Sequence, residues 1–145
     1  MTAREYLSQV YKLENKLHIM ELEAKEYRRL AAAVPGQDFT KERVQGGPIS
    51  KEAPFVKWII KAHEKEVEIQ RKMEELMSLK AKILATIDLV DNDYYRAILK
   101  LRYIESHPFQ DIAKKLFLAE STIKRMHREA IKYFDDNIIP KIDTK

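Results

Sequence analysis

The sequence contains no cysteine, and its 145 residues include only three glycines and five prolines. The lack of cysteine excludes disulfides and thiolate metal sites, and it fits a reducing cytosol. The scarcity of glycine and proline, together with few β-branched runs, argues against sheet structure. The sequence shows no signal peptide and no apolar stretch of membrane-spanning length. These absences predict an all-α protein of the cytoplasm without a membrane partner.

Motifs of enzymes and metal sites are also missing. The sequence has no glycine-rich phosphate-binding loop, no nucleophile elbow and no paired-carboxylate arrangement. Its histidines lack the spacing of metal ligands relative to carboxylates. We therefore expect no enzyme activity, no metal and no cofactor. Among these histidines, His127 is interpreted as a solvated helix position, with a phosphate contact as the alternative, and the single tryptophan, Trp58, as a packing anchor. The histidines are His18, His63, His107 and His127.

Two long helices are predicted in the first part of the chain, from about Thr2 to Ala33 and from about Ala53 to Ile87. In each, apolar residues recur at steps of three and four, which is typical of a coiled-coil seam. A helix with so narrow a stripe needs a partner. The first seam consists of Val10, Leu13, Leu17, Met20, Ala24, Tyr27, Ala31 and Val34. The second consists of Phe55, Ile59, Ala62, Ile69, Met73, Leu76, Ile83 and Ile87, widened by Ile60, Val67, Met77 and Leu84.

The segment 35–52 between these helices is rich in turn formers and predicts a loop. Two arrangements stay open: an antiparallel hairpin within one chain, or pairing of the long helices between chains. We favour the second, which gives a homodimer with raised affinity through avidity. The sequence thus divides into a long helical region at 1–89, a tri-helical module at 90–137 and a tail at 138–145.

The residues from Phe109 to Tyr133 predict two helices joined by a short turn. Apolar residues share one face of each helix, and Leu118 in the turn is expected to pack between them. Such a pair is the unit that places its second helix in the DNA major groove, although a plain helical hairpin is the alternative. Six Lys or Arg residues stand against three Asp or Glu residues here, a mild excess that supports phosphate binding. The buried faces are formed by Ile112, Ala113 and Leu116, and by Ile123, Met126, Ala130, Ile131 and Phe134.

A third helix is predicted upstream, from Asp91 to Glu105. Asp and Asn at its start are favourable N-cap residues, and His107-Pro108 stops it. This helix would brace the other two and complete the core of a small DNA-binding module. Its apolar stripe consists of Tyr94, Ala97, Ile98 and Leu101, and Tyr94, Tyr95 and Tyr103 are interpreted as core residues.

The stretch YYRAILKLRYIESHPFQDIAKKLFLAESTIKRMHREAIKYF resembles region 4, the promoter-reading C-terminal domain of bacterial sigma factors. A wider stretch, from about Arg43 to Phe134, is similar to sigma-region-4-like regulators of Gram-positive prophages, related in outline to the ArpU and RinA late-gene activators. The resemblance covers about two thirds of the chain. It implies a helix-turn-helix transcription regulator that binds double-stranded DNA, with RNA polymerase as a candidate partner. The matching elements are Leu101 to Tyr103, Ile112-Ala113, Ser121 to Ile123 and Ala130-Ile131.

Two positions depart from the family pattern. Phe117 stands where the turn usually has Gly or Asn in a left-handed conformation, which a bulky residue adopts at a cost of about 1–2 kcal/mol. We therefore expect the turn to take another shape. Ala119 replaces the N-cap serine, so the second helix is expected to begin at Glu120 or Ser121.

The outward pattern and the resemblance together predict a DNA interface. Ser121, Thr122 and Arg125 are expected to face base edges, with Arg125 able to bond guanine O6 and N7. Alternatives are an RNA-polymerase-binding adaptor, a DNA-packaging protein like a small terminase subunit, and a purely structural coiled coil. The residues expected to contact mainly phosphates are Lys114, Lys115, Lys124, Arg128 and Lys132.

Overall fold

The computed structural model describes residues 1–33 and 54–143, and these residues form helices and connecting turns without any strand. The predicted all-α class is confirmed. The predicted loop at 35–52 lies outside the described residues. The chain divides into two compact units: unit 1 comprises Met1–Glu14 and Glu75–Lys145, and unit 2 comprises Asn15–Glu74.

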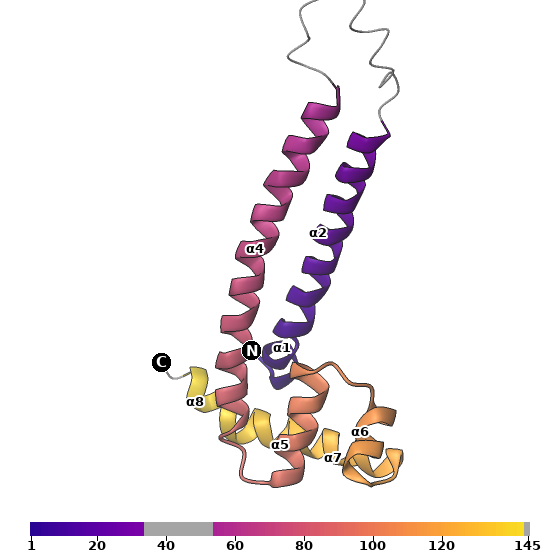
Figure 1. Cartoon of the computed structure of the whole chain (residues 1–145). Coiled ribbons are helices and arrows are strands. Elements are labelled where there is room, and N and C mark those ends of the chain that lie inside the picture. The colour runs from indigo at the N-terminus through magenta and orange to yellow at the C-terminus, as the bar shows by residue number, and fades with distance from the viewer. Residues whose placement is uncertain (34–53, 144–145) are drawn as a thin grey trace, which may run out of the picture. The chain divides into compact units, whose positions relative to one another are not determined.

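In unit 2, residues 15–32 of helix α2 (Gln9–Ala32) and residues 54–74 of helix α4 (Pro54–Ile87) lie side by side and run antiparallel within one chain (Figure 1). The rings of Tyr27 and Trp58 stack with their centroids 5.9 Å apart. The guanidinium of Arg28 bonds the carboxylate of Glu66 at 2.8 Å. The hairpin within one chain is therefore the arrangement that the structure contains, and Trp58 is the packing anchor that the sequence predicted. Whether two copies also associate stays a prediction.

The seam predicted for the second long helix is partly wrong. Ile59 and Met73 are 39% and 46% exposed, and the widening residues Ile60, Val67 and Met77 are exposed as well. The contact instead includes Trp58, which lies one position before the predicted seam residue Ile59, and Lys65. The side chain of Lys65 is only 23% exposed, and its ammonium group reaches the carboxylates of Glu23 at 3.5 Å and Glu68 at 3.4 Å. Trp58 and Lys65, which were not assigned to the seam, thus contribute contacts with α2.

Unit 1 begins with α1 (Ala3–Leu7), which Thr2 caps. The Thr2 hydroxyl accepts a bond from the amide of Glu5 at 3.2 Å, and the Glu5 carboxylate accepts one from the amide of Thr2 at 3.0 Å. Ser8 interrupts the helix before α2, so the single helix predicted from Thr2 to Ala33 is divided.

The core of unit 1 joins segments from both parts of the sequence that form it. Tyr6 of α1 packs on Phe134, with ring centroids 5.9 Å apart. Phe134 opens the π-helical turn η2 (Phe134–Ile138), and α8 (Ile139–Asp143) follows. Residues 138–143 were predicted to be part of a tail, but here they are helical, because Ile138 and Ile139 are buried in the core. The buried cluster consists of Ala3, Tyr6, Leu7, Val10, Ile83, Ile87, Val90, Leu99, Ala130, Ile131, Phe134, Ile138 and Ile139.

Helix α5 (Asp93–Leu99) packs through Ile98 on Ile112 and Ile123. It continues into another π-helical turn, η1 (Lys100–Ile104). The side-chain oxygen of Asn92 accepts bonds from two backbone amides at 2.9 and 3.1 Å, so the predicted N-cap is confirmed. Tyr94 is 50% exposed, so its assignment to the core is wrong. The turn η1 then leads to α6 (Phe109–Leu116) and α7 (Glu120–Tyr133).

Candidate nucleic-acid interface

The turn between α6 and α7 depends on Phe117, which has a left-handed backbone with φ 58° and ψ 42°. The amide of the next residue, Leu118, donates to the carbonyl of Ala113 at 3.0 Å and closes the carboxyl end of α6. This bond is the longer of the two that define a Schellman motif, in which glycine is the usual left-handed residue. The expectation that Phe117 would force another shape is wrong. The Phe117 side chain is 93% exposed, so it meets no packing obstacle in this conformation.

Helix α7 starts at Glu120, as predicted, without a side-chain cap. Ala119 holds the N-cap position in extended conformation and has no hydroxyl to accept a bond from the first amides. The helix is instead secured by its buried face. Ile123 is fully buried against Ile98, Ile112 and Ala113, with Leu118 packed onto the same cluster. The predicted packing of the two helices, including the inward position of Leu118, is confirmed.

The opposite face of α7 carries cations that project away from this core. The Arg125 side chain is 53% exposed and bonds Glu129 at 2.9 Å. Lys124 pairs with Glu120 at 3.2 Å and Lys132 with Asp136 at 3.3 Å. Exposed pairs spaced four residues apart on a helix contribute only about 0.3–0.5 kcal/mol, so these cations can exchange partners easily. Of the other predicted site residues, Ser121, Arg128, Lys114 and Lys115 are exposed and Thr122 is half-buried.

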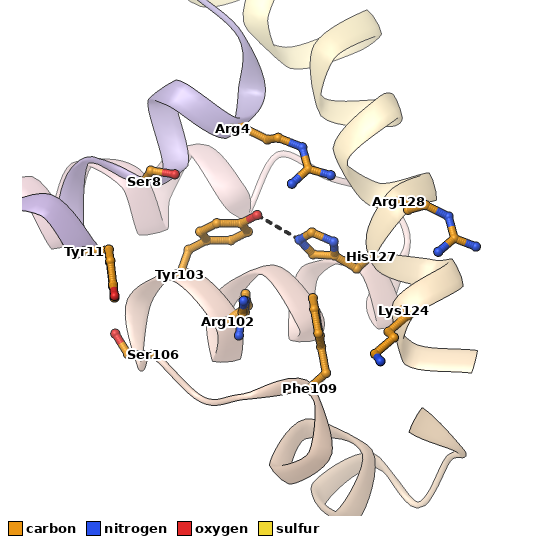
Figure 2. A pocket seen from close by; sticks show the side chains of 10 residues that line it. All are labelled: Arg4, Ser8, Tyr11, Arg102, Tyr103, Ser106, Phe109, Lys124, His127 and Arg128. Atoms are coloured by element: carbon orange, nitrogen blue, oxygen red, sulfur yellow. Dashed lines mark hydrogen bonds between the residues drawn. The ribbon is translucent and has the colours of Figure 1, made fainter. Parts of the chain in front are cut away.

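A second group of cations surrounds an aromatic cluster beside α7 (Figure 2). The hydroxyl of Tyr103 and Nε2 of His127 form a hydrogen bond of 2.8 Å. The His127 ring also meets the Phe109 ring edge-on, with centroids 5.0 Å apart. On the same ring of Phe109, the guanidinium carbon of Arg102 lies 4.3 Å from the centroid. These contacts connect η1, α6 and α7.

The interpretation of His127 as a solvated position is wrong, because its exposed fraction is 5%. Burial, followed by the positive charges of Arg4, Arg102 and Arg128, lowers the pKa of its imidazole to about 4. The residue is therefore a neutral member of the core at physiological pH, and a buried imidazole of this kind needs its hydrogen bond to Tyr103.

Around this cluster lies a cavity of about 660 Å³ with basic walls. Four of its lining residues are cationic: Arg4 from α1, Arg102 from η1, and Lys124 and Arg128 from α7. The two residues on α7 were predicted from the sequence, whereas Arg4 and Arg102 were not. The motif Leu101 to Tyr103 was a signal for Arg102, whereas no local pattern connects Arg4 with α7. Arg125, Lys114, Lys115 and Lys132 are not among the lining residues.

Two further properties of the described part of the chain concern function. Within residues 1–33 and 54–143, no group of three His, Asp or Glu side chains is arranged to hold a metal ion. No helix there combines the length and apolar character that crossing a membrane requires.

One family model matches the chain over residues 33–135, and its description reads "Protein of unknown function (DUF1492)". That span contains α4, α5, η1, α6 and α7, but not α1 or α2. No curated protein and no solved structure matches the chain. The resemblance to sigma region 4 and to prophage regulators therefore stays a prediction from the residues.

Proposed function

The chain belongs to the family described as "Protein of unknown function (DUF1492)", and we propose that it is a sequence-specific, double-stranded-DNA-binding transcriptional regulator of the prophage type that its sequence resembles. The observation that carries this proposal is the division of α7 into two faces. One face is buried on α5 and α6 through Ile123, while the other presents Arg125 and neighbouring cations to solvent. Because α7 is packed on one face only, its other face is free to enter a DNA groove.

In the proposed complex, α6, the turn and α7 act as a helix-turn-helix, and α7 enters the major groove with its amino end first. The uncapped amino end suits an anionic partner, because its first amides lack side-chain acceptors. Ser121, Thr122 and Arg125 then approach base edges. Arg125 exchanges its exposed pair with Glu129 for the O6 and N7 atoms of a guanine.

Phosphate contacts supply the sequence-independent part of the affinity. Lys114 and Lys115 lie in the last turn of α6, and Lys132 is 80% exposed on α7. These ammonium groups can follow the DNA backbone on either side of α7 without reading bases. Lys124 and Arg128 also line the basic cavity. The proposal thus separates Arg125, which specifies sequence, from lysines that add affinity.

The test starts with selection of bound sequences from a random DNA pool by the full-length chain. Arg125→Ala is then expected to lose about 1–3 kcal/mol of discrimination at one base pair and to leave preferences elsewhere unchanged. Lys115→Ala should weaken binding to all sequences alike and make the logarithmic salt dependence shallower by about 0.9. Arg71→Ala, which removes an exposed cation from α4, is the matched control. If Arg125→Ala leaves the base preferences of the selected site unchanged, the proposed readout is wrong.

We also propose a homodimer, supported by apolar side chains that unit 2 leaves exposed. Ile19 and Leu22 on α2 are 56% and 52% exposed, and Ile60 on α4 is 52% exposed. Light scattering of the full chain should give twice the mass of 17.1 kDa. A ring-sized assembly would favour the DNA-packaging alternative instead. Retention of RNA polymerase in the absence of DNA would favour the adaptor alternative.

A further inference from the structure

The residues that line the basic cavity of unit 1 carry positive charges and no negative charge. Arg4, Arg102, Lys124 and Arg128 line it, and no Asp or Glu is among its lining residues. The other lining residues are aromatic or carry hydroxyl groups, apart from the neutral imidazole of His127. They are Ser8, Tyr11, Tyr103, Ser106, Phe109 and His127.

The arginines of this cavity lack carboxylate partners. Within the part of the chain that the structure describes, neither Arg4 nor Arg128 forms an ion pair. Arg102 donates to the carbonyl of His107 at 3.3 Å and packs on an aromatic ring, which leaves its charge uncompensated. Lys124 is the exception, with its exposed pair to Glu120. Positive charges that share a concave site repel one another, and an anion bound among them would reduce this repulsion.

We propose that this cavity is a binding site for a phosphate group, held by Arg4, Arg102 and Arg128 with Lys124 at its edge. One arginine satisfies both oxygens of a planar carboxylate in a bidentate pair. Guanidinium groups that come from α1, η1 and α7 instead reach an anion from several directions, as the oxygens of a tetrahedral phosphate require. Ser8 brings a further hydroxyl group to the wall of the cavity, whereas the Ser106 hydroxyl there donates to the carboxylate of Glu14 at 3.0 Å.

Two kinds of ligand would supply such a phosphate group: a DNA backbone phosphodiester, or a free phosphate compound. Helix α7 favours the first, because Lys124 and Arg128 of the cavity stand on the helix that carries Arg125. A backbone phosphate flanking the groove would then contact Arg4, and α1 would become part of the DNA interface. This assignment to DNA rests on the proposed function, whereas the phosphate site itself does not.

The site is tested with inorganic phosphate as the probe, titrated into the full chain against sodium chloride at equal ionic strength. We expect saturable NMR shifts at the lining residues and a rise in the pKa of His127, since a bound anion offsets the cations that lower it. Arg4→Gln should weaken phosphate binding about tenfold, the equivalent of one charge-assisted hydrogen bond. Arg128→Gln is an independent second variant, and Arg71→Gln should bind phosphate like the unmodified chain. Shifts that do not saturate, or that persist unchanged in both cavity variants, would overturn the proposal.

The source is tested by fluorescence anisotropy with the selected DNA duplex. If DNA supplies the phosphate, Arg4→Gln weakens duplex binding about tenfold and makes the salt dependence shallower by about 0.9. If the variant weakens only inorganic phosphate, the site stands and its ligand is a free phosphate compound. If DNA binding depends on Arg125 but Arg4→Gln weakens the binding of neither phosphate nor DNA, the phosphate site is overturned. The proposed regulator function then stands. Saturable phosphate binding without DNA binding would support the phosphate site and overturn the regulator.

Discussion

Acidification from pH 7 to pH 5 should destabilise this protein through one buried side chain, His127. The imidazole is 5% exposed and shares a hydrogen bond of 2.8 Å with Tyr103. Its pKa is lowered to about 4, first by burial and then by the charges of Arg4, Arg102 and Arg128. Protonation of the folded state would therefore place a charge in the core beside three cations.

The sign of the effect follows from proton binding in the two states. Unfolded His127 takes up a proton near its usual pKa of about 6.5, whereas folded His127 does so only near pH 4. Between these values the unfolded state binds more protons, so the free energy of unfolding falls as the pH falls. For this residue alone, the fall from pH 7 to pH 5 amounts to about 2 kcal/mol. It approaches about 3 kcal/mol below pH 4.

Urea unfolding at pH 7 and pH 5, followed by circular dichroism in a buffer without phosphate, measures this difference. His127→Gln keeps a neutral side chain that can bond Tyr103, and we expect it to remove about 2 kcal/mol of the pH dependence, whatever its effect on stability at pH 7. His63→Gln, at an exposed position of α4, is the matched control. An equal pH dependence in the unmodified chain and His127→Gln would refute this account of the buried imidazole.

Two stability predictions concern single positions in the backbone. Phe117→Gly should raise the free energy of unfolding by about 1 kcal/mol, because φ is 58° and the lost ring is 93% exposed. Loss of stability in urea titrations would mean that the ring makes an unrecognised contact. Asn92→Ala should lower the free energy of unfolding by about 1 kcal/mol, since two amides of α5 lose their acceptor. An Asn92→Asp variant that keeps the acceptor is its control, and equal stability of both variants would contradict the capping role.

Local spacing was sufficient to predict α6, α7 and the core between them. Ile112 and Ile123 lie on apolar stripes whose period matches the helix, and both are fully buried. Even the buried position of His127 was accessible in this way, since it lies four residues after Ile123 and three before Ala130. The polar residue type led to the wrong interpretation, because it gives no sign of the hydrogen-bond partner that burial requires.

The basic cavity could not be predicted from spacing, because its walls come from segments distant in the sequence. Arg4 meets α7 only after α1 has packed on Phe134, through the ring of Tyr6. The same limit applies to the hairpin of unit 2. The apolar stripe predicted on α4 did not include Trp58, because its contact with Tyr27 of α2 joins residues distant in the sequence.

The amide of Ala3 donates a bond of 2.6 Å to the carboxylate of Asp135, 132 residues further along the chain. Closing such a long loop is slow, since its entropy must be lost before distant contacts can form. On the ribosome, residues 3–10 emerge with apolar side chains that wait for Phe134 and Ile138 to be synthesised. Cotranslational completion of unit 1 is therefore postponed to the last residues of its core, and a nascent chain released before them would lack the part of the core that contains Ala130 and Ile131 of α7.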